Sequence, residues 1–298
     1  MIKYLTPIPM LLFLFAGCEL YPQDEFEEDY VVEAYLVANR QLPQVRLSTT
    51  APAEAKYQFS DVAIDDADVE VRLLDEDDGS IERRFPYVRR SIGVYVTNIR
   101  HEVLPTREYQ LSVRFSNTED SLTATTFVPG EFGAQGATAD SIAYQDPAQI
   151  VINTSRSFYP SRQAFFIFSV DAIDPQPEKL TPFYNDQVNE QDEDIRSFYT
   201  NSSGIVNEEN YEFNDDGTIT LRVPWLAVAF YEDNFIIANA IDDNMYDFYR
   251  TQDVQGGGST LPPGEFQNII YNVEGGIGVF GSLASDTVRV FVKRNSQE

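Results

Sequence analysis

Alternation of apolar and polar residues with a period of two is the feature that most constrains the fold of this chain. Residues 109–115 read Tyr-Gln-Leu-Ser-Val-Arg-Phe, and residues 69–73 and 288–292 alternate in the same way. Successive side chains of a strand point to opposite faces, so this pattern buries one face and leaves the other in water. It predicts half-buried strands in antiparallel sheets and disfavours helices, whose apolar residues recur every three to four positions.

Further strands follow from the same pattern and from the turn residues between them. Asp77-Asp78-Gly79 and Asp215-Asp216-Gly217 carry the Asp-Gly pair that is favoured in tight hairpins. We expect an all-β, mainly antiparallel chain. The additional strands are expected at 31–38, 44–49, 80–85, 92–97, 121–128, 163–170, 219–223, 235–240 and 269–273.

The length and the spacing of the strands predict two domains. At about 150 residues per domain, 298 residues correspond to about two. Short, closely spaced strands predict an immunoglobulin-like β-sandwich at 30–128. The stretch 129–136 is rich in glycine and lacks alternation, so we interpret it as a linker. Residues 137–298 are expected to form a larger β-rich domain with longer loops, including a Pro- and acid-rich one at 171–194.

One short helix is predicted, near residues 242–254. Asp242 or Asp243 is the candidate N-cap, and the triple glycine at 256–258 ends the helix. Three residues with large apolar side chains fall on one face of this helix: Met245, Phe248 and Tyr249.

The first residues of the chain predict export and a lipid anchor. Lys3 precedes a short apolar run that ends in Ala16-Gly17-Cys18. Residues 1–17 are typical of a secretory signal peptide and too short to span a bilayer. Small-small-Cys resembles a bacterial lipobox, with Phe15 in place of the commonest Leu, and implies lipidation of Cys18. A buried N-terminal element or a free thiol in an oxidising compartment is less favoured.

Residues 18–29 form an acidic segment directly after this cysteine. Its acidic cluster consists of Asp24, Glu25, Glu27, Glu28 and Asp29. Such a segment is solvated and repelled by an anionic membrane surface. It also resembles the acidic tether that Bacteroidota lipoproteins use as a surface-export address. This resemblance implies a lipid-anchored outer-membrane protein that is displayed on the cell surface.

The charge and the cysteine count exclude several classes of function. The 48 acidic and 21 basic residues leave a net charge of −27, which repels phosphate backbones and argues against nucleic-acid binding. One Cys and one His cannot build a disulfide framework, a zinc cluster or, with Cys18 lipidated, a Cys–His nucleophile pair. No cofactor is expected from these counts.

Two weak candidates for chemistry remain. His101 is the one candidate imidazole base, although an exposed loop histidine is the favoured interpretation. Calcium (Ca²⁺) needs only oxygen ligands, but the acidic run 75–79 lacks the spacing and the closing Glu of an EF-hand loop. We therefore interpret that run as a solvated hairpin turn.

The closest match to a sequence motif is Gly-Gly-Ile-Gly-Val-Phe-Gly at 275–281. It contains Gly275, Gly276, Gly278 and Gly281, and the last three match G-x-G-x-x-G. A dinucleotide site needs a helix, a parallel strand and an acidic residue about 20 residues further on. Only the residues from 282 to 298 follow, and they alternate as a strand. We expect these glycines to let the backbone bend, bulge or approach another strand closely.

Aromatic residues are abundant, with 17 Tyr and 21 Phe. They gather in clusters at 158–159, 183–184, 198–199 and 246–249. Such clusters can form a sugar- or peptide-stacking surface, but aromatic residues also fill sheet cores, and the core is the favoured interpretation.

Several segments carry a resemblance to a known family. They are DYVVEAYL at 29–36, QVRLSTTAP at 44–52, DVEV at 68–71 and NIIYNVEGGIGVFG at 268–281. Together they resemble a Bacteroidota family of outer-membrane lipoproteins whose defining domain is of unknown function, although Ala34 stands where Gly is frequent. The resemblance covers nearly the whole chain after Cys18. It implies a setting beside TonB-dependent receptors that import nutrients, and it supplies no catalytic residues.

These observations favour a non-catalytic binding or accessory lipoprotein of a TonB-dependent nutrient-uptake system, with an unknown ligand. One alternative is a hydrolase of surface glycans or peptides that uses two carboxylates. Another is a structural adhesion module, in which immunoglobulin-like domains act as spacers. A cleft with two facing carboxylates at its floor favours the hydrolase, and a filled sandwich without a cleft counts against it.

Overall fold

The computed structural model describes residues 26–52, 54–136, 141–211, 213–253 and 268–295. Over these residues strands predominate over helices, and most strand pairs are antiparallel. The prediction of an all-β, mainly antiparallel chain is therefore confirmed.

The N-terminal part is an immunoglobulin-like β-sandwich. One layer contains β1 (Tyr30–Val37), β2 (Val45–Thr49), β5 (Val88–Ser91) and β6 (Val94–Val96). The other layer contains β3 (Ala67–Leu74), β4 (Ile81–Pro86), β7 (Glu108–Phe115) and β8 (Ser121–Phe127). Alternate residues from both layers, such as Val32 of β1 and Leu111 of β7, are fully buried in one apolar cluster. The period-two pattern therefore selects the face that each strand buries.

The C-terminal part also has two layers. The sheet of β1 continues through β16 (Glu232–Ile241), β12 (Phe165–Ala172), β13 (Thr200–Ser202) and β14 (Val206–Asn207). A three-stranded sheet lies against it and consists of β9 (Ala134–Gly136), β11 (Ile150–Thr154) and β15 (Ile219–Val223). Buried Ile152 and Val223 from the smaller sheet share a cluster with Val170 and Ile236 from the larger one.

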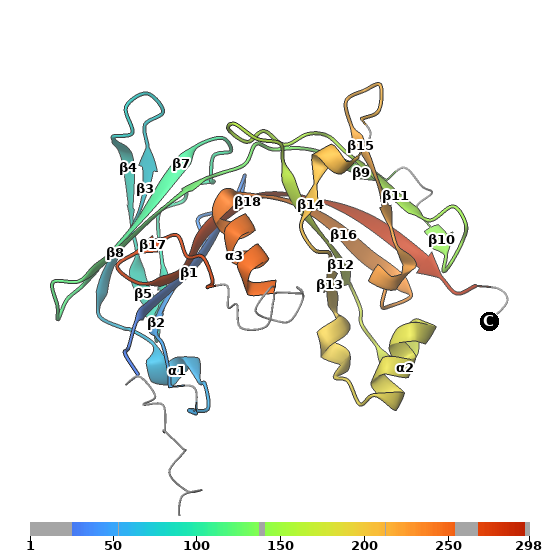
Figure 1. The fold of residues 1–298 in the computed structure, drawn as a ribbon, viewed down its shortest axis with the longest axis horizontal. Helices are drawn as coiled ribbons and strands as arrows, with labels where there is room; N and C mark the ends of the chain where they lie inside the picture. The colour runs from blue at the N-terminus through green and yellow to red at the C-terminus, as the bar shows by residue number, and fades with distance from the viewer. Residues whose placement is uncertain (1–25, 53, 137–140, 212, 254–267, 296–298) are drawn as a thin grey trace, which may run out of the picture.

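One long strand connects the two parts. β18 (Ile277–Lys293) runs across the molecule above α3 (Figure 1). Its first residues pair in parallel with β1, and from Leu283 onward it pairs antiparallel with β16. Near its end it also pairs with β10 (Ser141–Ala143), and β17 (Val273–Glu274) just before it joins β8. The domain division at 129–136 stays a prediction, because strands from both sides of it share the ten-stranded sheet.

The helices are short and lie outside the sheets. The expected helix is α3 (Asp243–Asp253), and α1 (Phe59–Val62) and α2 (Pro182–Glu190) are additional to the single helix predicted. The 3₁₀ turns are η1 (Pro177–Lys179), η2 (Ile195–Phe198), η3 (Glu208–Asn210) and η4 (Trp225–Ala227). The segment 171–194, expected to be a loop, thus contains η1 and α2. Pro182 at the start of α2 favours the beginning of a helix, but the acidic composition of the segment 171–194 favours a loop.

Two further segments differ from the expectations. Residues 134–136 of the expected linker form β9 and pair with β11. The strand expected at 269–273 is wrong apart from Val273, because residues 268–272 are not part of a strand. Ile270 N donates to the Thr251 hydroxyl, and the Asn272 side chain bonds both N and O of Phe280.

Candidate functional site

The glycine motif holds the crossing between the two parts of the chain. Gly275 and Gly278 have positive φ values of 84° and 115°, which L-residues rarely adopt. A Cβ at Gly278 would overlap the carbonyl oxygen of Val32, and one at Gly275 would overlap that of Ser121. The other two glycines are packed as closely: Gly276 against Tyr30 and Gly281 against Met245. The expected close approach of strands is present, and the motif's part in it is structural.

The anchor lies outside the described residues. Cys18, the signal peptide at 1–17 and most of the acidic tether fall within residues 1–25. Within the part of the chain that the structure describes, no helix is long and apolar enough to cross a membrane.

His101 is half-buried against the N-terminal sandwich. Its ring stacks on Phe85 with 4.3 Å between centroids, and its Nε2 lies 2.8 Å from the Tyr109 hydroxyl. Burial, assisted by the positive charge of Arg83, lowers the pKa of this imidazole below 6.5. His101 thus lies in a loop, as expected, but it is half-buried and not exposed.

The acidic turn at 75–79 borders a surface hollow of about 480 Å³. Its carboxylates are Asp75, Glu76 and Glu108. Asp75 accepts the Asp77 N–H at 2.9 Å, and Glu76 lies 2.9 Å from Arg107 Nε in an ion pair. Two of the three carboxylates are therefore engaged in holding the turn. No group of three or more Asp, Glu, His or Cys among the described residues is arranged to hold a metal ion.

An apolar cavity of about 380 Å³ lies between the two layers of the C-terminal part. The larger sheet contributes Phe168, Val170 and Ile236 to its wall, and β15 contributes Leu221 and Val223. All five side chains are at most 6% exposed, but Ser202, Arg222 and Leu226, which also line the cavity, are exposed, so the cavity lies between the layers and is open to solvent at one side. Such an apolar cavity with a few polar groups is the commonest form of a small-ligand site.

Polar groups lie where β13 borders the cavity. Asn201 Nδ2 donates to the Tyr184 hydroxyl and to the Ala227 carbonyl, both at 3.1 Å. Tyr184 in turn donates to the Leu226 carbonyl, which fixes α2 against η4. Burial raises the pKa of Tyr184, so its hydroxyl stays neutral. Among the described residues that line the cavity there is no Asp, Glu, His or Cys.

Sequence reasoning did not find this cavity. Its lining residues lie in separate segments between 168 and 236, and each segment alone has an ordinary strand or turn pattern. Of the aromatic clusters, only the one at 183–184 contributes a lining residue. Leu226, which also lines the cavity, is 56% exposed, and this exposure is evident only in the structure.

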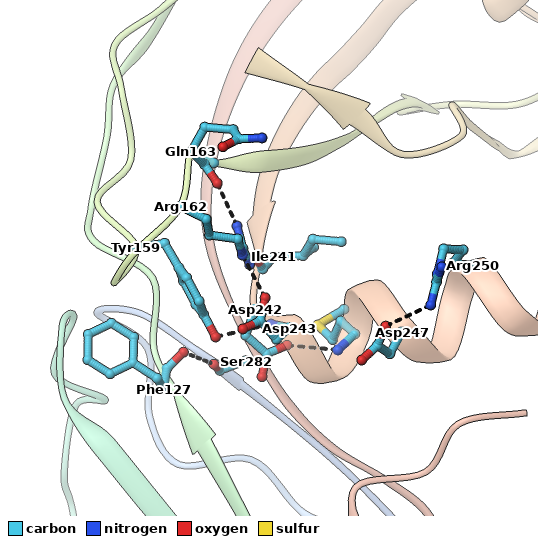
Figure 2. A network of polar contacts seen from close by, with 12 residues as sticks. Phe127, Tyr159, Arg162, Gln163, Ile241, Asp242, Asp243, Asp247, Arg250 and Ser282 are labelled. Carbon is cyan, nitrogen blue, oxygen red and sulfur yellow. Dashed lines mark hydrogen bonds and ion pairs between the residues drawn. The ribbon is translucent and has the colours of Figure 1, made fainter. Parts of the chain in front are cut away.

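A buried polar network marks the point where β8, β16, β18 and α3 meet (Figure 2). Asp242 is fully buried directly before α3, and its Oδ1 accepts the Met245 N–H at 2.9 Å. Asp242, and not Asp243, is therefore the N-cap of the helix. Burial raises the pKa of its carboxyl from 3.8 to about 6, because the charged form is poorly solvated there.

The number of hydrogen atoms that this network needs indicates that the Asp242 carboxyl is protonated. Its Oδ2 lies 2.5 Å from Thr126 Oγ1, which lies 2.7 Å from Ser282 Oγ. Ser282 Oγ lies 2.9 Å from the Phe127 carbonyl oxygen. These three contacts need three hydrogens, and the two hydroxyls supply only two. A protonated Asp242 supplies the third, and every contact then has one donor and one acceptor.

Arg162 covers the outer side of the same turn. Its Nε lies 2.6 Å from Asp243 Oδ1, and its terminal nitrogens donate to the carbonyls of Gln163 and Ile241. The guanidinium stacks on the Tyr159 ring at 3.7 Å from the centroid. Figure 2 shows Tyr159 and Arg162 directed at the start of α3. The network thus fixes α3 against both parts of the chain and exposes no reactive group.

Known structures resemble this chain only weakly. A tetra-tandem repeat from the extending region of a large adhesion protein is 13% identical with a TM-score of 0.26, over 90% of this chain and 50% of that one. The chicken CNTN1 FN1–FN3 domains are 14% identical with a TM-score of 0.25, over 89% and 67%. A Salmonella alpha-2-macroglobulin is 9% identical with a TM-score of 0.24, over 89% and 15%. This chain thus spans half the length of the adhesion-protein structure.

The sequence itself has one informative match. No curated protein matches the chain. One family model, described as a domain of unknown function (DUF4249), matches residues 19–289 and so includes both sheets of each part. The chain therefore belongs to the DUF4249 family.

Proposed function

We propose that this protein is a non-catalytic binding lipoprotein, anchored through Cys18 and displayed on the outer-membrane surface. It acts there as an accessory component of a TonB-dependent nutrient-uptake system. The observation that carries the binding role is the apolar cavity of about 380 Å³ between the two C-terminal layers. An open cavity of this size leaves apolar surface in contact with water, and an apolar ligand removes that surface from water.

The anchoring part of the proposal draws on the N-terminus. The lipobox places Cys18 at the start of the mature chain, and the family match begins at residue 19. Acyl chains on that cysteine supply membrane affinity at about 0.8 kcal/mol per buried CH₂. The acidic residues that follow keep the chain in water, away from an anionic leaflet.

The lining of the cavity supports binding over hydrolysis. A retaining or inverting glycosidase needs two carboxylates about 5–10 Å apart across the substrate. The described residues that line the apolar cavity include no carboxylate. In the hollow at 75–79, Asp75 and Glu76 are already held by Asp77 and Arg107, which leaves Glu108 alone.

Affinity capture tests the accessory role. The full-length chain, tagged at its C-terminus, is purified from gently solubilised native outer membrane, and its partners are identified by mass spectrometry. We expect a TonB-dependent barrel receptor to be recovered with the wild-type chain and not with the Cys18→Ser variant, which lacks the anchor. Recovery of the wild-type chain without a receptor, under conditions that preserve other outer-membrane complexes, contradicts the proposal.

A further inference from the structure

The walls of the apolar cavity belong to edge strands of both sheets. β13 and β14 form one edge of the ten-stranded sheet, and β15 is an edge of the three-stranded sheet. All three strands line the cavity, whereas no described residue of β9 or β11 does. The cavity therefore lies where the C-terminal sandwich is open at its side, between two strand edges. The edge of β15 has an isolated bridge from Ile219 to Phe213, and neither edge has a further neighbour among the described strands.

The cavity also interrupts the apolar core. Phe168 and Leu221 belong to the large cluster that extends into the N-terminal sandwich. Val170, Val223 and Ile236 belong to the separate C-terminal cluster, although Val170 and Val223 are each only two residues further along the same strands. A gap of about 380 Å³, the share of roughly a dozen water molecules, lies between these clusters. Apolar side chains placed there would join the two clusters into one core.

The edge of β13 offers main-chain hydrogen bonds at this opening. Ser203 N donates to Phe168 O, and Ala172 N donates to Tyr199 O, so the odd-numbered residues bond to β12. Antiparallel pairing alternates, and the N–H and C=O groups of Thr200 and Ser202 therefore point away from β12. Within the described chain these groups of Thr200 and Ser202 have no hydrogen-bond partner, which leaves an edge that another strand can pair with.

We infer that the cavity receives an extended peptide, which pairs with the free edge of β13 and inserts alternate apolar side chains between the two sheets. This is strand addition, in which main-chain bonds give affinity and side-chain pockets give specificity. The inference rests on the proposed function, since it names the ligand class of the same cavity.

The net charge of the protein indicates which residues the peptide carries between its apolar positions. The net charge is −27, and the one charged residue among those lining the cavity is Arg222, an exposed cation. The field of such a protein concentrates cationic ligands and repels anionic ones. The preferred peptide therefore alternates apolar residues with uncharged or basic ones. An acyl chain would fill the same apolar space but would leave the edge of β13 unused.

The test uses a fluorescently labelled, end-blocked peptide of eight residues that alternates valine with threonine and lysine. Binding to the mature chain is measured by fluorescence anisotropy. Two further peptides carry N-methyl groups on one or the other alternate set of main-chain nitrogens. We expect one methylated peptide to bind at least tenfold more weakly and the other to bind like the parent, because only one set faces β13.

Protein variants locate the binding. Ser202→Pro removes an N–H that points away from β12, so the sheet retains its own bonds while peptide affinity falls at least tenfold. Ser202→Ala is its control and keeps the affinity. Val206→Phe fills the cavity and weakens binding at least tenfold, whereas Val151→Phe, the same change outside the lining, has no effect. Thermal melting verifies that each variant is folded.

The outcomes separate the inference from the proposed function. If both methylated peptides bind like the parent, or if Ser202→Pro has no effect, strand pairing is refuted. If decanoate binds in a manner sensitive to Val206→Phe and the peptide does not bind, the ligand is an acyl chain, and the inference falls while the binding role stands. If neither probe binds, the inference is overturned, and the accessory role is judged separately by receptor capture.

Discussion

Replacing Asp242 by asparagine tests the buried network at the start of α3. Asparagine has nearly the same shape, and its Oδ1 can still accept the Met245 N–H. Its Nδ2 can donate to Thr126 Oγ1, as a protonated carboxyl would at the 2.5 Å separation of Asp242 Oδ2 and Thr126 Oγ1. The substitution therefore keeps the hydrogen bonds of the neutral carboxylic acid and removes only the possibility of a buried negative charge.

The pKa of Asp242 gives the direction and the size of the effect. Its folded-state value of about 6 lies above the ordinary 3.8, so the folded chain binds the proton more tightly than the unfolded chain. This contribution to stability is fully present below pH 3.8 and is lost as the pH rises through 6. At pH 7 and above, the ionised carboxyl costs about 3 kcal/mol relative to the protonated one. We therefore expect Asp242→Asn to stabilise the protein by about 2–3 kcal/mol at pH 8 and to change little at pH 4.

The assay is urea unfolding of both proteins at several pH values between 4 and 8. The difference between the variant and the wild type isolates Asp242 from the repulsion among the other acidic residues. Asp247→Asn is the control on the same helix, since its exposed pair with Arg250 is worth less than about 1 kcal/mol. If Asp242→Asn destabilises the protein at pH 8, the buried carboxylate is a favourable charged cap, and the argument from the hydrogen count is refuted.

Three further predictions concern other residues. Gly278→Ala should destabilise the chain by about 3 kcal/mol or more in a denaturation experiment, because φ is 115° and the added Cβ overlaps Val32 O. Gly133→Ala is the control: its added Cβ meets nothing within 4 Å, so the free energy of unfolding should change little. The single imidazole of His101 should titrate below pH 6.5 by NMR. Its contribution to stability is present above pH 6.5 and should be lost as the pH falls below that value, because the unfolded chain binds the proton first. A folded-state pKa of 6.5 or more contradicts the packing argument. Metabolic labelling with palmitate should mark the wild-type chain and not Cys18→Ser, and an unlabelled wild type would remove the anchor from the proposal.

The strands were predictable where alternation extends over several residues. β3, β7 and β16 carry that pattern and lie within a few residues of the expected positions. β11 was missed because Ile150–Thr154 is a short segment whose sequence does not alternate, although Asp146-Pro147 signals a turn just before it. The segment 269–273 has the composition of a strand, but Ile270 N bonds the Thr251 hydroxyl and the Asn272 side chain bonds the main chain of Phe280, and those contacts depend on α3 and β18.

The candidate site was much less predictable than the strands. The helix cap at Asp242 or Asp243 was expected from the sequence, but the burial of Asp242 follows from Thr126 and Ser282, which lie in distant segments. The cavity needs β13 and β15 at the edges of two different sheets, and strand order is not encoded in the pattern of any one strand. The volume that stays unfilled between the two sheets depends on how they pack, and the sequence of a single strand does not indicate it.

The sequence by itself determined which faces the strands bury, where α3 begins, and that the glycines at 275–281 allow a close approach. These are local properties, because the period of two, the cap residue and the absence of a Cβ act within a few residues. The tertiary structure alone decided that β18 joins β1 to β16, that Asp242 is shielded from water, and that the C-terminal sandwich is open beside β13. Those features arise from packing between segments that are not adjacent in the sequence, where shape and burial are set by all the neighbours together.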